Sequence, residues 1–176
     1  MTEAELIRAF TDLPGVVAVV ASEENGAPEV AWGDSFFFYD PDNADPDHRR
    51  LPFASIVTKD YAGFDAASEL DRPGVFRLNL AVGRDRFTEL FGFSSAEFAE
   101  RRTGFDFTAV DHIIPHPVYA SQAWICVLVP GADTEKQVQQ LIGHAYKRAR
   151  ARYRSDRRAA AHHESHHGPD RADNDE

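Results

Sequence analysis

The chain has 176 residues, about the size of one domain, and 43% of them are apolar, including 13 Phe, which excludes disorder over most of the length. Its formal net charge of −10 disfavours nucleic acid and anionic membrane surfaces as partners. The single cysteine, Cys126, excludes an intramolecular disulfide.

The first residues predict a short amphipathic helix. Thr2 and Glu5 have the spacing of a capping box, and apolar residues follow at helical intervals until Pro14. The charged residues before and at Arg8 occupy the positions where a secretion signal would be apolar, and no apolar run reaches the length of a membrane span. We therefore expect a soluble cytoplasmic protein with no membrane contact.

Two extended runs follow and predict a β-hairpin. They cover 16–21 and 30–39, and the dipeptide Asn25-Gly26 lies between them in a turn. The next stretch, 40–50, contains two prolines and four aspartates without periodicity. We interpret it as an acidic, solvated loop.

The rest of the chain carries both strand and helix signals. Segment 74–82 alternates apolar and polar side chains, which predicts a half-buried strand with Arg77 and Asn79 on its polar face. Segment 104–122 shows no regular period. The other predicted elements are strands at 53–58 and 123–129 and helices at 85–91, at 95–101 and after Thr134.

This order of elements predicts the α+β fold class. We expect a single compact domain over 1–153, in which the N- and C-terminal helices pack on one face of a mainly antiparallel sheet. Residues 154–176 are rich in Arg, His and Asp, and burial of so few apolar groups does not offset the entropy of ordering them. We therefore expect a disordered C-terminal tail.

Four motifs together resemble a known family. They are AWGDSFFFYDPD, PFASIVTKDY, LDRPGVFRLNLAVG and HPVYASQAWICVLVPG, and the resemblance covers roughly 5–153. The sequence is similar to the uncharacterised family catalogued as domain of unknown function 6194 and, more distantly, to the MmcQ/YjbR-like proteins. The resemblance implies a compact sheet like that of the YjbR/frataxin-like and double-wing-like folds, and it implies no reaction.

One candidate site lies in the segment from Asp111 to Tyr119. His112 and His116 stand four residues apart, but the prolines at 115 and 117 exclude a regular helix that would place both imidazoles on one face. His116 or His112 with Asp111 is a candidate for acid-base catalysis or for metal ligation. In the alternative interpretation, which we favour, His116 bonds to the backbone and shapes the loop, and there is no metal.

A second candidate site combines polar residues from three predicted strands with aromatic side chains. If these strands are neighbours, their polar residues line one face, where Arg77 offers a guanidinium fork to a carboxylate or phosphate. The alternative is a surface ladder of ion pairs. The residues of this predicted ligand-binding site are Trp32, Asp34, Lys59, Arg77, Asn79 and Tyr119.

A basic stretch at 147–158 ends the predicted last helix. Its arginines at 148, 150, 152 and 154 recur with a period of two, so we expect their charges to spread around the helix. In the purely structural interpretation, the stretch is a solvated helix end whose positive charges complement the helix dipole. The functional alternative is contact with nucleic acid or with an acidic partner.

The function that we predict from these features is binding of a small anionic molecule without established catalysis. The first alternative is an enzyme that uses His116 or His112 with Asp111, and the second is a nucleic-acid or protein interaction module that uses the basic helix end. The sequence names no cofactor, and it leaves both enzymatic activity and oligomeric state undetermined.

Overall fold

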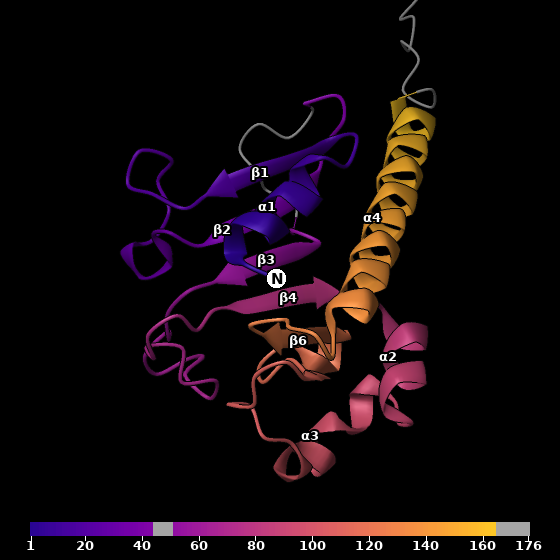
Figure 1. Ribbon diagram of the computed structural model, residues 1–176. Coiled ribbons are helices and arrows are strands. Elements are labelled where there is room, and N and C mark those ends of the chain that lie inside the picture. The colour runs from indigo at the N-terminus through magenta and orange to yellow at the C-terminus, as the bar shows by residue number, and fades with distance from the viewer. Residues whose placement is uncertain (44–50, 165–176) are drawn as a thin grey trace, which may run out of the picture.

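The computed structural model describes residues 1–43 and 51–164, with side chains through residue 159. Short 3-10 helices are labelled η, and Figure 1 shows the arrangement. The elements in chain order are α1 (Glu3–Thr11), β1 (Val16–Val20), η1 (Glu29–Ala31), β2 (Ser35–Tyr39), β3 (Ala54–Val57), β4 (Arg77–Ala81), α2 (Arg84–Phe91), η2 (Ser95–Glu97), α3 (Phe98–Arg101), η3 (Arg102–Gly104), β5 (Ile113–Pro115), η4 (Ala120–Gln122), β6 (Trp124–Leu128) and α4 (Glu135–Glu164).

The strands form one antiparallel sheet in the order β1-β2-β3-β4-β6-β5. Helices α1 and α4 both lie against the same face of this sheet, and α2 and α3 lie beyond the β6 side (Figure 1). The α+β class with terminal helices on one face of an antiparallel sheet is therefore confirmed. The comparison with YjbR/frataxin-like folds stays a prediction.

Aromatic packing holds α1 on the sheet. The capping box of Thr2 and Glu5 starts the helix as predicted, and its buried face includes Phe10. The Phe10 ring stacks on Phe37 of β2 with centroids 4.1 Å apart. Because side chains alternate along a strand, Tyr39 shares the face of Phe37, and its ring meets Tyr146 of α4 edge-on at 5.7 Å.

The second strand is shorter than predicted. The run 30–39 was expected to be extended throughout, whereas its first part forms η1 and β2 begins only at Ser35. Gly33 has a φ of +91°. It donates its N–H to the carbonyl of Ala21, while the Ala21 N–H bonds to the carbonyl of Asp34. Two residues thus oppose one, which is a β-bulge at the glycine.

A strand was missed within 104–122. Ile113–Pro115 forms β5, which pairs with β6 from Ile113↔Val127 to Pro115↔Ile125. It is only three residues long and ends on a proline, so it lacks the length and alternation by which a strand is recognised.

The prediction that Arg77 and Asn79 occupy an exposed strand face is wrong. Only 1% of Arg77 and 2% of Asn79 are exposed, so β4 is buried on both faces. The segment around the Tyr61–Asp65 bridge supplies hydrogen-bond and ion-pair partners on that side, and His116 from the loop after β5 lies against the Arg77 guanidinium. The sequence of one strand does not show whether segments distant in the chain pack over its polar face.

Helix α4 extends beyond the predicted domain boundary. The sequence predicts disorder from 154 onward, whereas the helix continues to Glu164 because Arg and Ala are strong helix formers. The remaining tail, 165–176, and most of the predicted acidic loop, at 44–50, lie outside the described residues. None of the helices in the described part of the chain combines the length and apolar content needed to span a bilayer.

Candidate functional site

The polar residues of β4 belong to a buried network around Arg77. Its Nη1 donates to Asp65 Oδ1 at 3.0 Å and to Ser68 Oγ at 2.8 Å, and its Nη2 donates to Asp65 Oδ2. Its Nε donates to Asn79 Oδ1 at 2.9 Å, and Asn79 in turn donates to Ser55. Burial is the largest single effect and acts to lower the pKa of Arg77, but the hydrogen bond to Asp65 together with nearby negative charges, including those of Asp65 and Asp60, raises the pKa overall. The guanidinium fork is therefore already filled by a carboxylate of the protein itself.

His116 completes this network from the loop after β5. Its Nδ1 accepts hydrogen bonds from the backbone N–H groups of Val118 and Tyr119, each at 3.1 Å. The ring proton therefore lies on Nε2, which is 3.3 Å from Arg77 Nη2 and 3.9 Å from Asp65 Oδ2. Burial, followed by the positive charge of Arg77, lowers the pKa of His116 well below its ordinary value.

This geometry disfavours His116 as a general base. One ring nitrogen has its lone pair engaged by two backbone donors, and the other carries the proton. The Tyr119 ring covers the imidazole with centroids 4.9 Å apart, and burial raises the pKa of Tyr119. The interpretation that His116 shapes its loop is the one that these contacts support.

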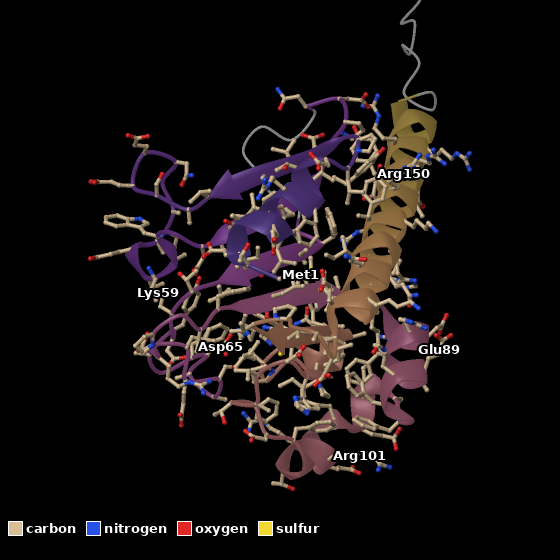
Figure 2. The ribbon with its side chains drawn as sticks, viewed as in Figure 1. Met1, Lys59, Asp65, Glu89, Arg101 and Arg150 are labelled. Carbon is tan, nitrogen blue, oxygen red and sulfur yellow. The ribbon has the colours of Figure 1, made fainter. Side chains whose placement is uncertain are left out.

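The other predicted binding residues lie at the end of the sheet away from α4, where Lys59 is labelled in Figure 2, and only Asp34 among them is buried. Asp34 is fully buried, and its Oδ1 accepts from the N–H and the hydroxyl of Thr58 at 2.8 and 3.0 Å. Its Oδ2 accepts from the Tyr61 hydroxyl at 2.6 Å. Lys59 donates to the carbonyl of Trp32. These bonds occupy the polar atoms on which ligand binding was expected to depend.

Asp111 and His112 do not join His116. Asp111 accepts from the N–H groups of Gly131 and Asp133, at 2.7 and 3.0 Å, and from both the N–H and the hydroxyl of Thr134. The Thr134 hydroxyl, aided by these backbone donors, lowers the pKa of Asp111 to about 2. His112 is exposed at the other end of β5 from His116 and contacts the Val110 carbonyl. The three residues therefore form neither a catalytic group nor a shared set of metal ligands.

A cleft of about 110 Å³ opens between α4 and the adjoining ends of β2 and β3. Its walls are mostly apolar and aromatic, and two arginines of α4 stand at its border. The residues that line it are Phe38, Tyr39, Asp40, Leu51, Pro52, Phe53, Ala81, Ala145, Arg148, Ala149, Arg152, Tyr153 and Asp156.

Two parallel rows of α4 side chains build the helical wall of the cleft. Ala145, Ala149 and Tyr153 recur every fourth residue, and because the two alanines are small they leave room between the helix and the sheet. Arg148 and Arg152 form the neighbouring row, one helical turn apart. Figure 2 shows that Arg150, between them in sequence, also lies on this helix beside the sheet.

Arg148 is positioned by a glycine. A Cβ atom at Gly83 would lie 2.3 Å from the Arg148 guanidinium, so the arginine packs directly over the glycine backbone, whose φ is +81°. One turn earlier, His144 Nε2 donates to the carbonyl of Val82 at 2.9 Å and holds the helix at this point. Within the described residues, neither Arg148 nor Arg152 has a hydrogen bond or an ion pair.

The sequence-based analysis missed Arg148 and Arg152 as cleft residues. The period of two in the arginine run drew attention to charges spread around the helix, although each alternate pair is four apart and shares a face. The alanines at 145 and 149 lie beside these arginines on the side of the helix that faces the cleft. The other wall comes from 38–40 and 51–53, far away in sequence, and only the fold brings the two walls together.

Comparison with known proteins gives a family and no further likeness. Residues 1–159 match the model of a family described as "Family of unknown function (DUF6194)". The search of curated proteins and the search of solved structures both find no match. The match spans nearly all the ordered elements, from α1 into α4, and it agrees with the resemblance carried by the four sequence motifs: the chain belongs to the DUF6194 family.

Proposed function

We propose that this protein binds a small anionic molecule in the cleft beside α4. The observation that carries the proposal is the pair Arg148 and Arg152, whose guanidinium groups have no hydrogen-bond or ion-pair partner among the described residues and stand at the border of a mainly apolar cleft. The predicted function, anion binding, is kept, and its site moves from Arg77 to these two residues. Arg77 is unsuited because Asp65 already fills its fork.

The charges of the cleft favour an anion. Arg148 and Arg152 are exposed, and a carboxylate or phosphate between them would accept charge-assisted hydrogen bonds from both. Two acids also line the cleft, but Asp40 is buried and has an interaction of its own, and Asp156 lies at the outer end, one turn beyond Arg152. Close packing over Gly83 places the Arg148 guanidinium beside the sheet.

The volume and walls of the cleft indicate the kind of molecule. About 110 Å³ is less than the roughly 150 Å³ of a cavity that holds benzene, so the cleft accommodates part of a small ring compound whose remainder stays in solvent. Tyr39, Phe53 and the alanines of α4 supply the apolar contact. We therefore propose a carboxylate or phosphate attached to a small apolar or aromatic group.

The lining supports binding rather than covalent catalysis. Among the described residues of the chain, the lining includes no Ser, Cys, His or Lys to act as a nucleophile. Cys126 is fully buried in β6, and burial raises its pKa to about 12. The alternative function as an enzyme using His116 or His112 with Asp111 has no support from the positions of those side chains.

Calorimetric titration with benzoate tests the proposal, and benzamide, which has the same shape without the charge, is the matched ligand control. We expect binding of benzoate with little or no binding of benzamide. The double variant Arg148→Gln/Arg152→Gln should weaken benzoate binding at least tenfold, or about 1.4 kcal/mol.

The control variant is Arg154→Gln/Arg157→Gln, which removes the same charge from exposed positions of α4 outside the cleft. We expect it to bind benzoate with nearly the affinity of the unmodified protein. Equal loss in both double variants would show a diffuse charge effect, and binding that survives Arg148→Gln/Arg152→Gln would place the anion elsewhere. Either result contradicts the proposal.

A further inference from the structure

The first strand forms an edge of the sheet and carries none of the usual protective residues. In the part of the chain that the structure describes, β1 pairs with β2 alone, and Val16–Val20 contains no charged residue and no proline. At the opposite edge, β5 is three residues long and ends on Pro115. Natural edge strands are commonly shortened, charged or interrupted by proline, because an open row of N–H and C=O groups pairs with another strand.

The hydrogen bonds at the two ends of β1 show which of its backbone groups face away from β2. Asp40 donates its N–H to the carbonyl of Gly15, and Ala21 donates its N–H to the carbonyl of Asp34, so 15 and 21 both face β2. Alternate residues of an antiparallel strand bond to the same neighbour. The N–H and C=O groups of Val16, Ala18 and Val20 therefore point outward.

Two of these six outward groups already have partners inside the chain. The Val16 N–H donates to the carbonyl of Leu13 at 3.2 Å. The Val20 carbonyl accepts from the side-chain amide of Asn25 at 2.7 Å. Four groups remain without a partner among the described residues, namely the Val16 C=O, the Ala18 N–H, the Ala18 C=O and the Val20 N–H.

We propose that this edge binds β1 of a second copy of the chain, antiparallel and with a two-fold axis at Ala18. That rotation pairs the N–H of each Ala18 with the C=O of the other, and the N–H of each Val20 with the C=O of the other Val16. All four remaining groups of each copy are then satisfied. The two groups that would also face each other, the Val16 N–H and the Val20 C=O, are those that Leu13 and Asn25 already occupy.

The edge is therefore complementary to itself in its partial charges, with each free donor opposite a free acceptor. Pairing would also bring the side chains of this edge into contact across the two strands, since Ala18 is exposed and Val20 is 54% exposed. Electrostatic repulsion between two chains of net charge −10 each disfavours dimerisation. Because salt screens this repulsion and leaves the backbone bonds in place, dimerisation should strengthen as ionic strength rises.

Sedimentation equilibrium of the full chain tests the proposal with the variant Ala18→Pro. Proline removes an N–H that points away from β2, which an edge strand tolerates, so the fold should persist by circular dichroism. We expect a dimer for the unmodified chain in the micromolar range and at least tenfold weaker dimerisation for Ala18→Pro. The matched control Ala18→Ser keeps the N–H and should remain dimeric.

Two further measurements make the outcome decisive. Val20→Lys places a charge on the edge without touching the backbone and should also give a monomer, so it decides the question if Ala18→Pro does not fold. Amide hydrogen exchange at Ala18 and Val20 should slow as protein concentration increases. A monomeric unmodified chain, a dimer that survives both edge variants, or larger open assemblies would overturn the proposal.

Discussion

Arg77 and Asp65 form a two-pronged ion pair in the interior, with only 1% and 8% of the two side chains exposed. The pair joins β4 to the segment that follows β3 and closes the sheet face opposite the helices. It also explains why the residue best suited by type to bind an anion does not do so here: its charge is neutralised by the protein's own carboxylate.

Removing one partner of this pair should be costly. Asp65→Asn leaves the Arg77 guanidinium buried without a counter-charge, and we expect the free energy of unfolding to fall by about 3–5 kcal/mol in urea titrations. Replacing both residues, as in Arg77→Met/Asp65→Leu, removes the buried charges altogether and should restore much of the stability.

The exposed pair of Arg86 and Glu89, at 2.7 Å, is the control for that experiment. Glu89→Gln should cost less than about 1 kcal/mol, because solvent screens the interaction. A similar small loss for Asp65→Asn would show that the buried pair is not a structural requirement.

His116 should make stability depend on pH in the weakly acidic range. Its pKa is lowered in the folded state by burial and by Arg77, whereas in the unfolded chain it returns to about 6.5. Below that pH the unfolded state takes up a proton that the folded state does not, so the free energy of unfolding falls as pH decreases. His116→Asn keeps an acceptor for the loop N–H groups and should lose this dependence.

The comparison for the pH experiment is His112→Asn, because His112 is exposed. When urea unfolding is measured at pH values from 7 to 5, the free energy of unfolding should change with pH equally in this variant and in the unmodified chain. Identical slopes in all three proteins would contradict the assignment of a neutral, buried His116.

Asp111 should stabilise the start of α4 in a pH-dependent way. Asp111→Asn suits the backbone, whose φ is +55°, but weakens the bonds to Gly131, Asp133 and Thr134, and we expect a loss of about 1 kcal/mol near neutral pH. Because the pKa of Asp111 is lowered to about 2, its contribution is complete above about pH 4 and is lost as pH falls toward 2.

The free energy of unfolding of the Asp111→Asn variant should therefore approach that of the unmodified chain as pH falls toward 2. Asp133→Asn, at an exposed position nearby, is expected to leave stability nearly unchanged. A difference between Asp111→Asn and the unmodified chain that stays constant from pH 5 to 2 would contradict the lowered pKa.

Cys126 should be inert in the folded protein. It is fully buried, and burial raises its pKa to about 12, so almost no thiolate is present near neutral pH. A disulfide reagent should modify the thiol promptly in urea and only on the timescale of unfolding in native buffer. Prompt modification of the native protein would contradict this burial.

The fold was largely predictable because its periodic signals are local. The capping box at Thr2 and the alternation along β4 each lie within one element and indicate whether it is a helix or a strand. Prediction from the sequence was wrong where contacts between distant segments determine whether a strand forms or a side chain is buried. Strand β5 is too short to show alternation, and the burial of Arg77 depends on Asp65, which lies in a different segment.

The candidate site was less predictable for the same physical reason. Asp34 and His116 were named as candidates for a binding or catalytic site, whereas their hydrogen bonds to Thr58, Tyr61 and the loop N–H groups are made within the protein's own structure. The cleft is built by two segments that are distant in sequence. Only Arg148 and Arg152 carried a local signal, their four-residue spacing.

The most direct test of the central claim is to locate bound anion by two-dimensional amide NMR during titration with benzoate. We expect the largest shifts at residues of the cleft, such as Ala81, Ala145 and Ala149, and none that depend on benzoate around Asn79 or Ser68. Shifts centred on the Arg77 network, or no saturable shifts at all, would contradict an anion site beside α4.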